Sequence, residues 1–439
     1  PVEGWNYPAT RKAYEDAFKW AREAGKPALV HALVTQPFGH SSSGDHRRYK
    51  TPERLQWETD NDCIDHMRKW ILASKIGTAE ELSAIENEET DDVKSETAQA
   101  WEDYQKPIRE LGERTVALYE QIPEARNEIT ELRKKMDSED PTAVITRGDI
   151  VASIRKILRA TRGKESSARN YLENLHHEIT KDVHEKYSSH VYAEGEKSPI
   201  NQKPVKPEYE YLTEKEIPKD TGAHIIAAGL ATLMKDDPRI VCFGEDAGKI
   251  GGVTTCTLGL QGGKSQMPPE IWDKSPALQK YTPENGFGES RVWDHAIAEG
   301  SIIGSATGMA LRGLRPVPEI QYLDYSVWGL QQMVDEVASL RHRTDDGQEA
   351  PMLIRTHGHQ LVGMWHSGSP VGMILASCPG LRVLVPRNAT QAVGMYRAVL
   401  KSHDPAFSVE PLQSLYKPES VPSNLDEICI PLGQSEVLK

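Results

Sequence analysis

The stretch "SIIGSATGMALRGLRPVPEIQYL", residues 301–323, predicts a helix and then a strand. Small residues fill its first half, "RGLRP" predicts a turn, and the apolar second half has the length of a buried strand. Residues 222–246, "GAHIIAAGLATLMKDDPRIVCFGED", repeat the plan with a turn at Pro238. This alternation predicts the α/β class, with a mainly parallel sheet covered by helices on both faces. Further helices are expected at 328–343 and 389–402, and further strands at 350–356, 381–388 and 405–411.

The first 200 residues have a different pattern. Residues 10–25, "TRKAYEDAFKWAREAG", predict a helix, and residues 26–35, "KPALVHALVT", predict a buried strand. From about residue 51 to 192 we expect mostly helix, including a long acidic helix that Thr78 would cap. The Pro- and Lys-rich residues 195–208 are predicted to be the main linker.

Composition excludes several classes of protein. The 439 residues suggest two or three domains, and a net charge of -13 argues against a nucleic-acid-binding protein. No apolar run approaches the roughly 20 residues of a membrane span. Five scattered cysteines without a CxxC pair predict reduced thiols and a cytoplasmic location. These cysteines are Cys63, Cys242, Cys256, Cys378 and Cys429.

A polar loop follows the first predicted strand. Residues 38–50, "FGHSSSGDHRRYK", present an imidazole and three hydroxyl groups directly after it. Ligands of open α/β sheets bind outside the carboxyl ends of strands, so this loop is expected to line a site.

Glu299 stands at the start of the small-residue helix. One interpretation is structural, because a carboxylate is stabilised by a helix N-terminus. The other is functional: a partly buried carboxyl group with raised proton affinity could pass a proton to a ring nitrogen.

Three histidines follow the strand at 350–356, namely His357, His359 and His366. The HxH spacing could hold a metal, but no Asp or Cys ligand pattern accompanies it. The alternatives are an active-site loop in which one histidine contacts substrate, and a polar loop without a role. Phosphate-binding glycine motifs and a nucleophile elbow are absent from the sequence.

Several of these motifs, in this order, resemble the thiamine-diphosphate-dependent 2-oxoacid dehydrogenases. "GHSSS", residues 39–43, resembles a motif near the C-terminal end of their α subunit. "VCFGEDAGKIGGVTTCTLGL", residues 241–260, the stretch at 296–325 and "HSGSP", residues 366–370, resemble their β subunit. The likeness is greatest to a fused α/β form of the branched-chain (2-oxoisovalerate) type.

The resemblance implies a thiamine-diphosphate-binding fold in three parts. Residues 1–107 would be the end of the α-like, diphosphate-side region, 108–219 a helical bridge and Pro-rich linker, and 220–439 the β-like pyrimidine-binding domain. The implied cofactors are thiamine diphosphate and Mg²⁺, whose GDG ligand motif would lie upstream of Pro1. The chain would then be an internal piece that alone neither binds the cofactor tightly nor turns over. The implied partners are a lipoyl-bearing dihydrolipoyl acyltransferase and a second copy of the chain.

The resemblance also implies roles for residues of the pyrimidine pocket. Glu299 would hydrogen-bond the pyrimidine nitrogen and favour the imino tautomer, which removes the proton from the thiazolium carbon. Ile297 would lie beneath the cofactor, and Gln321 and Tyr325 would line the pocket.

The remaining implied site residues lie in loops. His40 would reach the diphosphate end and assist acylation of the lipoyl group, with Ser41 beside it. His366 would face the substrate. Gln36 replaces a usual arginine, and Gly44 a usual aspartate. Alternatives are a transketolase-like enzyme, which shares the logic of Glu299, and a non-catalytic helical assembly module.

Overall fold

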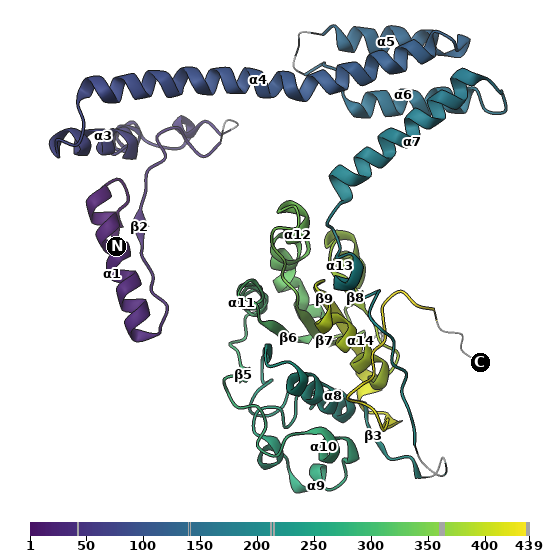
Figure 1. Ribbon diagram of the computed structural model, residues 1–439. Coiled ribbons are helices and arrows are strands. Elements are labelled where there is room, and N and C mark those ends of the chain that lie inside the picture. The colour runs from purple at the N-terminus through teal and green to yellow at the C-terminus, as the bar shows by residue number, and fades with distance from the viewer. Residues whose placement is uncertain are drawn as a thin grey trace. The chain divides into compact units, whose positions relative to one another are not determined.

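The computed structural model describes residues 1–41, 44–138, 140, 142–210, 213, 216–359 and 365–435. The chain forms two compact units, Pro1–His176 and His177–Lys439 (Figure 1). The first unit is mostly helical and the second has the α/β pattern that the sequence predicts. We describe each unit by itself.

Six parallel strands form the sheet of the second unit, in the order β5-β4-β6-β7-β9-β8. The chain therefore crosses over the sheet between neighbouring strands, as βαβ units require. The strands are β4 (Ile240–Gly244), β5 (Val292–Asp294), β6 (Arg315–Tyr322), β7 (Leu353–Gly358), β8 (Arg382–Leu384) and β9 (Ala406–Pro411). A separate antiparallel pair joins β3 (Lys219–Thr221) to β10 (Pro418–Ser420).

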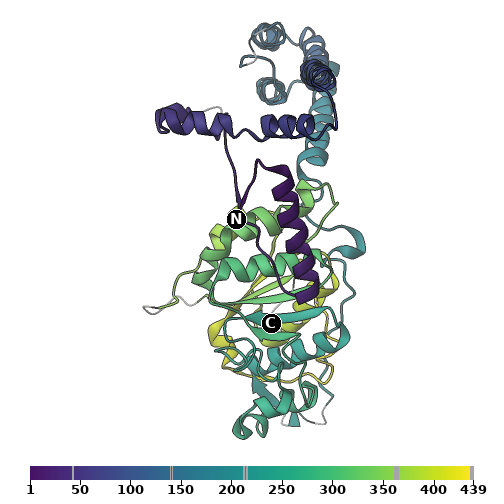
Figure 2. The ribbon, with the colours of Figure 1, turned by 90° about the vertical axis from the view of Figure 1, so that its left-hand side faces the viewer.

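Helices cover the sheet on both faces, as Figures 1 and 2 show. Side chains of α8 (Gly222–Asp236) and α14 (Ala389–Lys401) share one apolar cluster, whereas those of α11 (Glu299–Leu311) and α13 (Val371–Ser377) share another. The shorter helices of the unit are α9 (Pro269–Trp272), α10 (Pro276–Tyr281), α12 (Leu340–Arg343) and α15 (Leu412–Leu415).

Neighbouring residues of each strand enter opposite clusters. Cys242 and Leu353 belong to the cluster of α8 and α14, and the next residues, Phe243 and Ile354, belong to the cluster of α11 and α13. This alternation follows from the two-residue repeat of a strand. Both faces are apolar because both are covered, which explains the nearly continuous apolar strands in the sequence.

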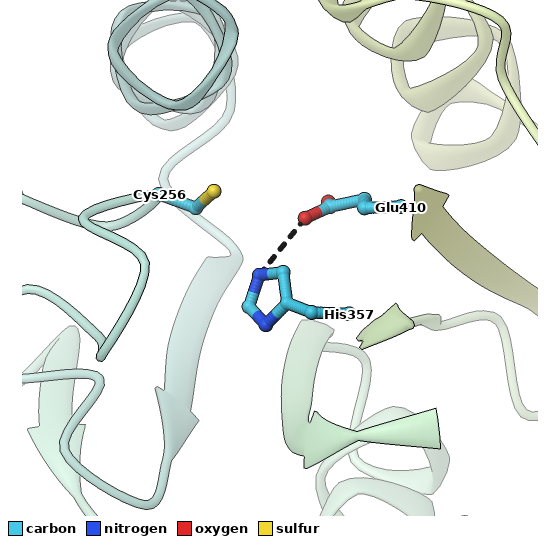
Figure 3. A group of neighbouring side chains, drawn as sticks. All are labelled: Cys256, His357 and Glu410. Atoms are coloured by element: carbon cyan, nitrogen blue, oxygen red, sulfur yellow. Dashed lines mark ion pairs between the residues drawn. The ribbon is translucent and has the colours of Figure 1, made fainter. Parts of the chain in front are cut away.

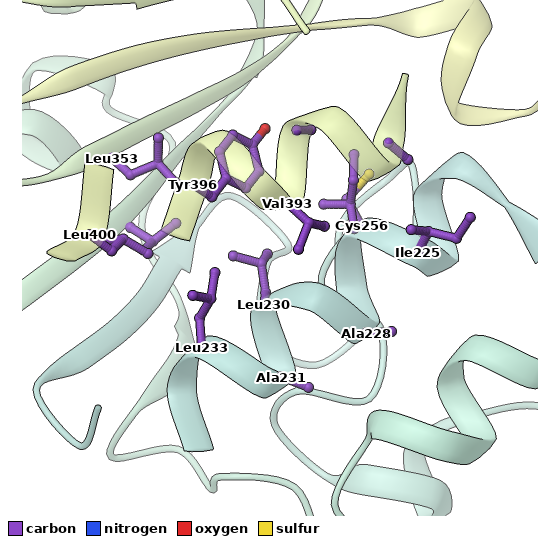
Figure 4. Close-up of a cluster of buried hydrophobic side chains, with 14 of the residues drawn as sticks. Ile225, Ala228, Leu230, Ala231, Leu233, Cys256, Leu353, Val393, Tyr396 and Leu400 are labelled. Carbon is purple, nitrogen blue, oxygen red and sulfur yellow. The ribbon is translucent and has the colours of Figure 1, made fainter. Parts of the chain in front are cut away.

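The first cluster brings α8 and α14 very close together (Figure 4). A Cβ atom added at Gly229 of α8 would lie 2.3 Å from Cγ2 of Val393 in α14. A glycine is therefore required at this crossing for a steric reason, and the apolar pattern alone does not reveal it.

The sequence predictions for the second unit are largely confirmed. The expected strands and the helices at 222–236, 301–311 and 389–401 are present. Residues 328–343 differ, because they do not form one α-helix. A 3-10 helix ends at Gly329, a π-helix covers Gln332–Ala338, and only Leu340–Arg343 is α-helical.

The predicted linker, residues 195–208, is irregular but is attached to the second unit. Val205 forms an isolated antiparallel bridge with Cys429, and the Leu432 amide donates to the Pro199 carbonyl. All five cysteines are free thiols, and Cys63 is the exposed one.

The first unit contains one long helix, α4 (Ala79–Tyr119). Thr78 caps it as predicted, in a reciprocal capping box with Glu81. The other helices are α1 (Tyr7–Ala24), α2 (Pro52–Asp60), α3 (Cys63–Ala73), α5 (Arg126–Met136), α6 (Arg147–Ala160) and α7 (Ser167–Ser188), the last of which continues into the second unit. No helix in the described part of the chain is long and apolar enough to cross a membrane.

The predicted buried strand at 26–35 is wrong. Only β2 (Ala32–Leu33) forms there, and it pairs in parallel with β1 (Val2–Glu3). Leu29 and Val34 are 92% and 68% exposed. The residues have strand propensity, but within the described first unit no second layer covers them, and burial rather than propensity sustains a strand.

Candidate functional site

The carboxyl ends of the parallel strands carry most of the candidate residues. Glu245 and Asp246 follow β4, Tyr322 ends β6, and His357 lies next to the last residue of β7. Because neighbouring parallel strands end at the same edge, polar side chains from separate segments gather there, where ligands of open α/β sheets bind.

Glu299 is the first residue of α11, as the sequence predicts. It is half-buried, and no donor in the described residues hydrogen-bonds its carboxylate. Burial, together with the charges of Asp246 and Glu299, raises the pKa of Glu245. Neighbouring negative charges thus disfavour the ionised form of Glu245.

His366 lies in an aromatic and acidic environment made by the end of β6 and the 3-10 helix after it, Leu323–Gly329. Its ring stacks on Tyr322, with ring centroids 3.8 Å apart and planes 8° from parallel, and Tyr325 approaches edge-on at 5.2 Å. The His366 Nδ1 atom lies 3.3 Å from Oδ1 of Asp324. His366 also has a left-handed backbone with φ of 55°, which costs energy in a non-glycine residue and is typical of functional sites.

The 3-10 helix that carries Tyr325 packs against the first turn of α11. A Cβ atom added at Gly329 would lie 3.5 Å from the Glu299 carbonyl oxygen, and one at Gly300 would lie 3.4 Å from the Trp328 carbonyl oxygen. Glu299 and the residues around His366 thus belong to adjoining elements of one strand-end region.

Gln321 and Ile297 border the same region. The register between β6 and β7 shifts between Ile320 and Tyr322, so Gln321 is the extra residue of a β-bulge. Bulges reorient side chains and are common beside active sites. Ile297 is 72% exposed and lies between β5 and α11.

His40 and Ser41 belong to the first unit. Both are exposed, and the loop turns at Gly39, whose φ is 81°. Ser42 and Ser43 lie outside the described residues. The Gln36 carbonyl accepts the Gly39 amide.

Asp45 has a local role in the same loop. It caps the 3-10 helix His46–Arg48 and pairs with Arg47, whose hydrogen bond to the side chain lowers the pKa of Asp45. Asp45, one position after Gly44, therefore stabilises the short 3-10 helix that follows it.

The structure also shows a buried charged cluster that the sequence analysis missed. Arg355 in β7 pairs with Glu319 of β6 at 2.9 Å and with both carboxylate oxygens of Glu410 in β9, at 2.8 and 3.0 Å. His357 lies beside them, and Cys256 approaches from the loop after β4 (Figure 3). The sequence does contain a signal for this cluster, because each of three apolar strand segments includes a charged residue. The segments are "PEIQY", "LIRTH" and "FSVEP".

The HxH pair does not converge on one point. His357 is fully buried in the charged cluster, whereas His359 is exposed and contacts the Ser369 hydroxyl at 3.1 Å. Among the residues that the structure describes, Cys256, His357 and Glu410 form the single group with metal-ligating spacing. Within the described residues, the two histidines therefore do not share one metal site.

Two family models match this chain. Residues 221–417 match the transketolase pyrimidine-binding domain, and residues 1–109 match the dehydrogenase E1 component. The first match contains every strand of the six-stranded sheet and five of the candidate residues just described: Glu245, Glu299, Gln321, Tyr325 and His366. The second contains His40 and Ser41.

Curated relatives agree with these matches. The β subunit of the pyruvate dehydrogenase E1 component of Acholeplasma laidlawii is 35% identical over 47% of this chain and 56% of its own length. The 2-oxoisovalerate dehydrogenase β subunits of Pseudomonas aeruginosa and Bacillus subtilis are 36% and 30% identical, over 42% and 46% of this chain and 47% and 55% of their own lengths. The chain thus spans about half the length of these relatives.

The two matched segments lie in the order E1 component, then pyrimidine-binding domain, on one polypeptide. The parallel sheet with helices on both faces lies within the second of these segments. This chain is thus similar, in two separate segments, to the subunits of thiamine-diphosphate-dependent 2-oxoacid dehydrogenases.

Proposed function

We propose that the protein acts in the decarboxylating dehydrogenase component of a 2-oxoacid dehydrogenase complex. The observation that carries this proposal is the half-buried Glu299 carboxylate, which has no hydrogen-bond partner in the described residues. It belongs to the first turn of α11, whose backbone packs against the 3-10 helix after β6. An unpaired carboxylate at a strand-end site fits a ligand that supplies a ring nitrogen.

Thiamine diphosphate, when bound, supplies a nucleophilic carbon and an electron sink for loss of CO₂ from the 2-oxoacid. Glu299 would hold a proton at the pyrimidine nitrogen through its carboxylate oxygen. Gln321, Tyr325 and Ile297 would line the pocket for that ring. The exposed side chain of Ile297 leaves an apolar surface for a flat ring to cover.

His366 would act on the substrate side. If its Nδ1–H donates to Asp324, its Nε2 is left to exchange a proton with the substrate, which is the division of roles that an oriented imidazole provides. The stacked Tyr322 ring holds the imidazole plane in place.

In the first unit, His40 and Ser41 would serve the diphosphate end of the site and acyl transfer to a lipoyl group. The exposed loop that carries them suits a site that must admit a lipoyl arm from an acyltransferase. The E1-component match over residues 1–109 supports this role for the segment.

Further parts of the proposal concern substrate and assembly. The substrate would be a branched-chain 2-oxoacid, with Mg²⁺ as second cofactor and two copies of the fused chain forming a cytoplasmic dimer. We also propose the division into an α-like segment 1–107, a bridge 108–219 and a pyrimidine-binding domain 220–439. The two 2-oxoisovalerate dehydrogenase relatives favour the branched-chain substrate, and the pyruvate dehydrogenase relative favours pyruvate.

A transketolase-like reaction is the second candidate, because the model that matches residues 221–417 is shared with transketolase. The E1-component match over residues 1–109 favours the dehydrogenase. A non-catalytic assembly role would leave Glu299 without function.

The substitution Glu299→Gln separates these candidates. The full-length protein is assayed with pyruvate, 2-oxoisovalerate and 2-oxoglutarate for lipoamide acylation, and with a ketose phosphate for ketol transfer. Loss of proton transfer is expected to lower lipoamide acylation, or ketol transfer if the protein is transketolase-like, by about 10²- to 10⁴-fold. The matched control is Glu270→Gln, at an exposed residue of α9, which should retain activity. Full activity of the Glu299→Gln variant would contradict the proposal.

A further inference from the structure

We infer that His357 is a buried imidazolium ion that fixes the β-bulge at Gln321, and that it thereby positions the pyrimidine side of the site. The charge state of His357 stands on geometry alone. Its positioning role rests on the proposed function, because it requires that Gln321 borders a bound cofactor.

Both ring nitrogens of His357 face hydrogen-bond acceptors. Nδ1 lies 3.0 Å from the backbone carbonyl oxygen of Gln321, and Nε2 lies 3.0 Å from Oε2 of Glu410. A carbonyl oxygen accepts and cannot donate, and so does an ionised carboxylate. Nδ1 therefore has to carry a proton. Nε2 lies beside the Glu410 carboxylate and a hydroxyl that can donate or accept, and the negative charge of Glu410 favours a second proton there, which gives the imidazolium form. The Thr254 hydroxyl, 3.0 Å from Nε2, adds a further oxygen on that side.

The charges around the ring balance. The residues that face the cluster are Glu319 of β6, Arg355 of β7, Glu410 of β9, Cys256 and Thr254 of the loop after β4, and Tyr396 of α14, whose hydroxyl donates to Glu410. The carboxylates of Glu319 and Glu410 and the guanidinium of Arg355 together carry a net charge of about -1. A protonated His357 neutralises this charge. All four ionised side chains are at most 2% exposed, so an unbalanced charge there would be costly.

The pKa directions agree with this geometry. Burial disfavours the charged ring, but the hydrogen bonds to Cys256 and Glu410 outweigh it and hold the pKa of His357 well above its ordinary value. Burial likewise raises the pKa of Glu410, but Arg355 and His357 outweigh it and keep that pKa below its ordinary value.

A metal ion is the competing explanation, because Cys256, His357 and Glu410 offer ligand atoms within 4.8 Å of one another. A metal would require a thiolate and a neutral imidazole. Burial raises the pKa of Cys256, and Glu410 is already engaged by Arg355 through both oxygens. A divalent ion would also add two positive charges beside a buried guanidinium. The site therefore favours a proton on His357 over a metal.

The consequence for the site lies at the bulge. Gln321 has no partner residue in the β7 ladder, since Ile320 pairs with Thr356 and Tyr322 pairs with His357. The imidazolium binds the carbonyl of this extra residue from the side. It thus fixes the direction in which β6 leaves the sheet, toward Tyr322 and the ring of His366.

The first test measures the charge state in the full-length protein without any cofactor. Histidine labelled with ¹⁵N is observed by long-range proton–nitrogen correlation at about pH 8, where an ordinary histidine is neutral. His357 should still show two protonated ring nitrogens. The signal is assigned by its loss in the His357→Asn variant, or in His357→Asn/Glu410→Gln, which restores the charge balance if the single variant does not fold. A neutral ring at that pH would overturn the inference.

The second test measures the positioning role by calorimetric titration of thiamine diphosphate with Mg²⁺. His357→Asn should weaken cofactor binding by about tenfold or more, a loss of about one hydrogen bond to a charged group. The control is His342→Asn, because His342 also contacts a backbone carbonyl, that of Ser189 at 2.7 Å, away from the strand ends. It should change the melting temperature and leave the dissociation constant unchanged.

The outcomes of the second test are distinct. Equal dissociation constants for the wild type and the folded His357→Asn variant would overturn the positioning role and leave His357 merely structural. Failure of the wild-type protein to bind thiamine diphosphate would overturn the proposed function and the positioning role together, while the result on the charge state would stand.

Discussion

Asp324 and His366 form the pair of residues whose geometry says most about chemistry. Their polar atoms lie 3.3 Å apart, and both side chains are about one-third exposed or less, at 32% and 27%. An aspartate in this position selects the tautomer in which Nδ1 carries the proton and stabilises the protonated ring when it forms. Under the proposed function, Nε2 would then face the substrate as the nitrogen that exchanges a proton.

The substitution Asp324→Asn should therefore lower kcat more than it raises KM. We expect a loss of about 10- to 10³-fold in kcat, because the ring loses its orientation and its counter-charge while the pocket keeps its shape. The control is Asp335→Asn at an exposed aspartate of the π-helix. An unchanged kcat in Asp324→Asn would argue that Asp324 has no part in orienting His366.

The candidate residues could be predicted at the residue scale where a motif marks them. Glu299 stands at the start of a predicted helix and Gln321 within a predicted strand, and the structure has both elements there. Tyr325 lies in a 3-10 helix that the sequence analysis did not predict. The partners of His357 could not be predicted, because Glu319, Arg355 and Glu410 come from three strands whose lateral order is set by the fold and leaves no local pattern in the sequence.

At the scale of elements, the crossing of α8 and α14 depends on one missing side chain. Gly229 lets Val393 approach to a distance that no Cβ atom would tolerate. Val393 is β-branched and completely buried, so it has little freedom to move away.

We expect Gly229→Ala to destabilise the protein by about 1–3 kcal/mol through overpacking. The matched control is Gly308→Ala in α11, where an added Cβ meets open space, and which should stabilise by about 0.5–1 kcal/mol. Chemical denaturation measures both. Adding Val393→Ala should recover part of the loss in Gly229→Ala, and strictly additive effects would show that the two residues do not clash.

The elements themselves were predicted with unequal success, for a physical reason. Strands β4, β6, β7 and β9 are buried on both faces, so their sequences are mostly apolar and are easily identified. The segment at 26–35 has the same apolar character, yet only two of its residues form a strand. The sheet strands and residues 26–35 both have strand propensity. They differ because helices cover the sheet strands, whereas no layer of the described first unit covers residues 26–35.

At the scale of the whole molecule, the buried charged cluster makes stability depend on pH. The pKa of His357 is raised in the folded state, so its contribution is fully present below the unfolded pKa of about 6.5 and declines as the pH rises toward the folded value. The pKa of Glu410 is lowered, so its contribution is present above about pH 4.3 and is lost on acidification.

Thermal melts of the wild type and His357→Asn between pH 5 and 9 test this account. The difference in melting temperature should be largest near pH 6 and should shrink as the pH rises, because only the wild type loses the benefit of a protonated ring. A difference that instead grows between pH 5 and about pH 7 would mean that the ring is neutral in the folded protein, because only the unfolded chain would then bind the extra proton.

The central claim is that the Glu299 carboxylate serves the pyrimidine ring of thiamine diphosphate, and a crystal structure of the protein with the cofactor and Mg²⁺ tests it most directly. The account predicts a carboxylate oxygen of Glu299 within hydrogen-bond distance, about 2.6–3.2 Å, of a ring nitrogen. A bound cofactor whose pyrimidine ring lies out of reach of Glu299, with that side chain still in contact with solvent, would contradict it.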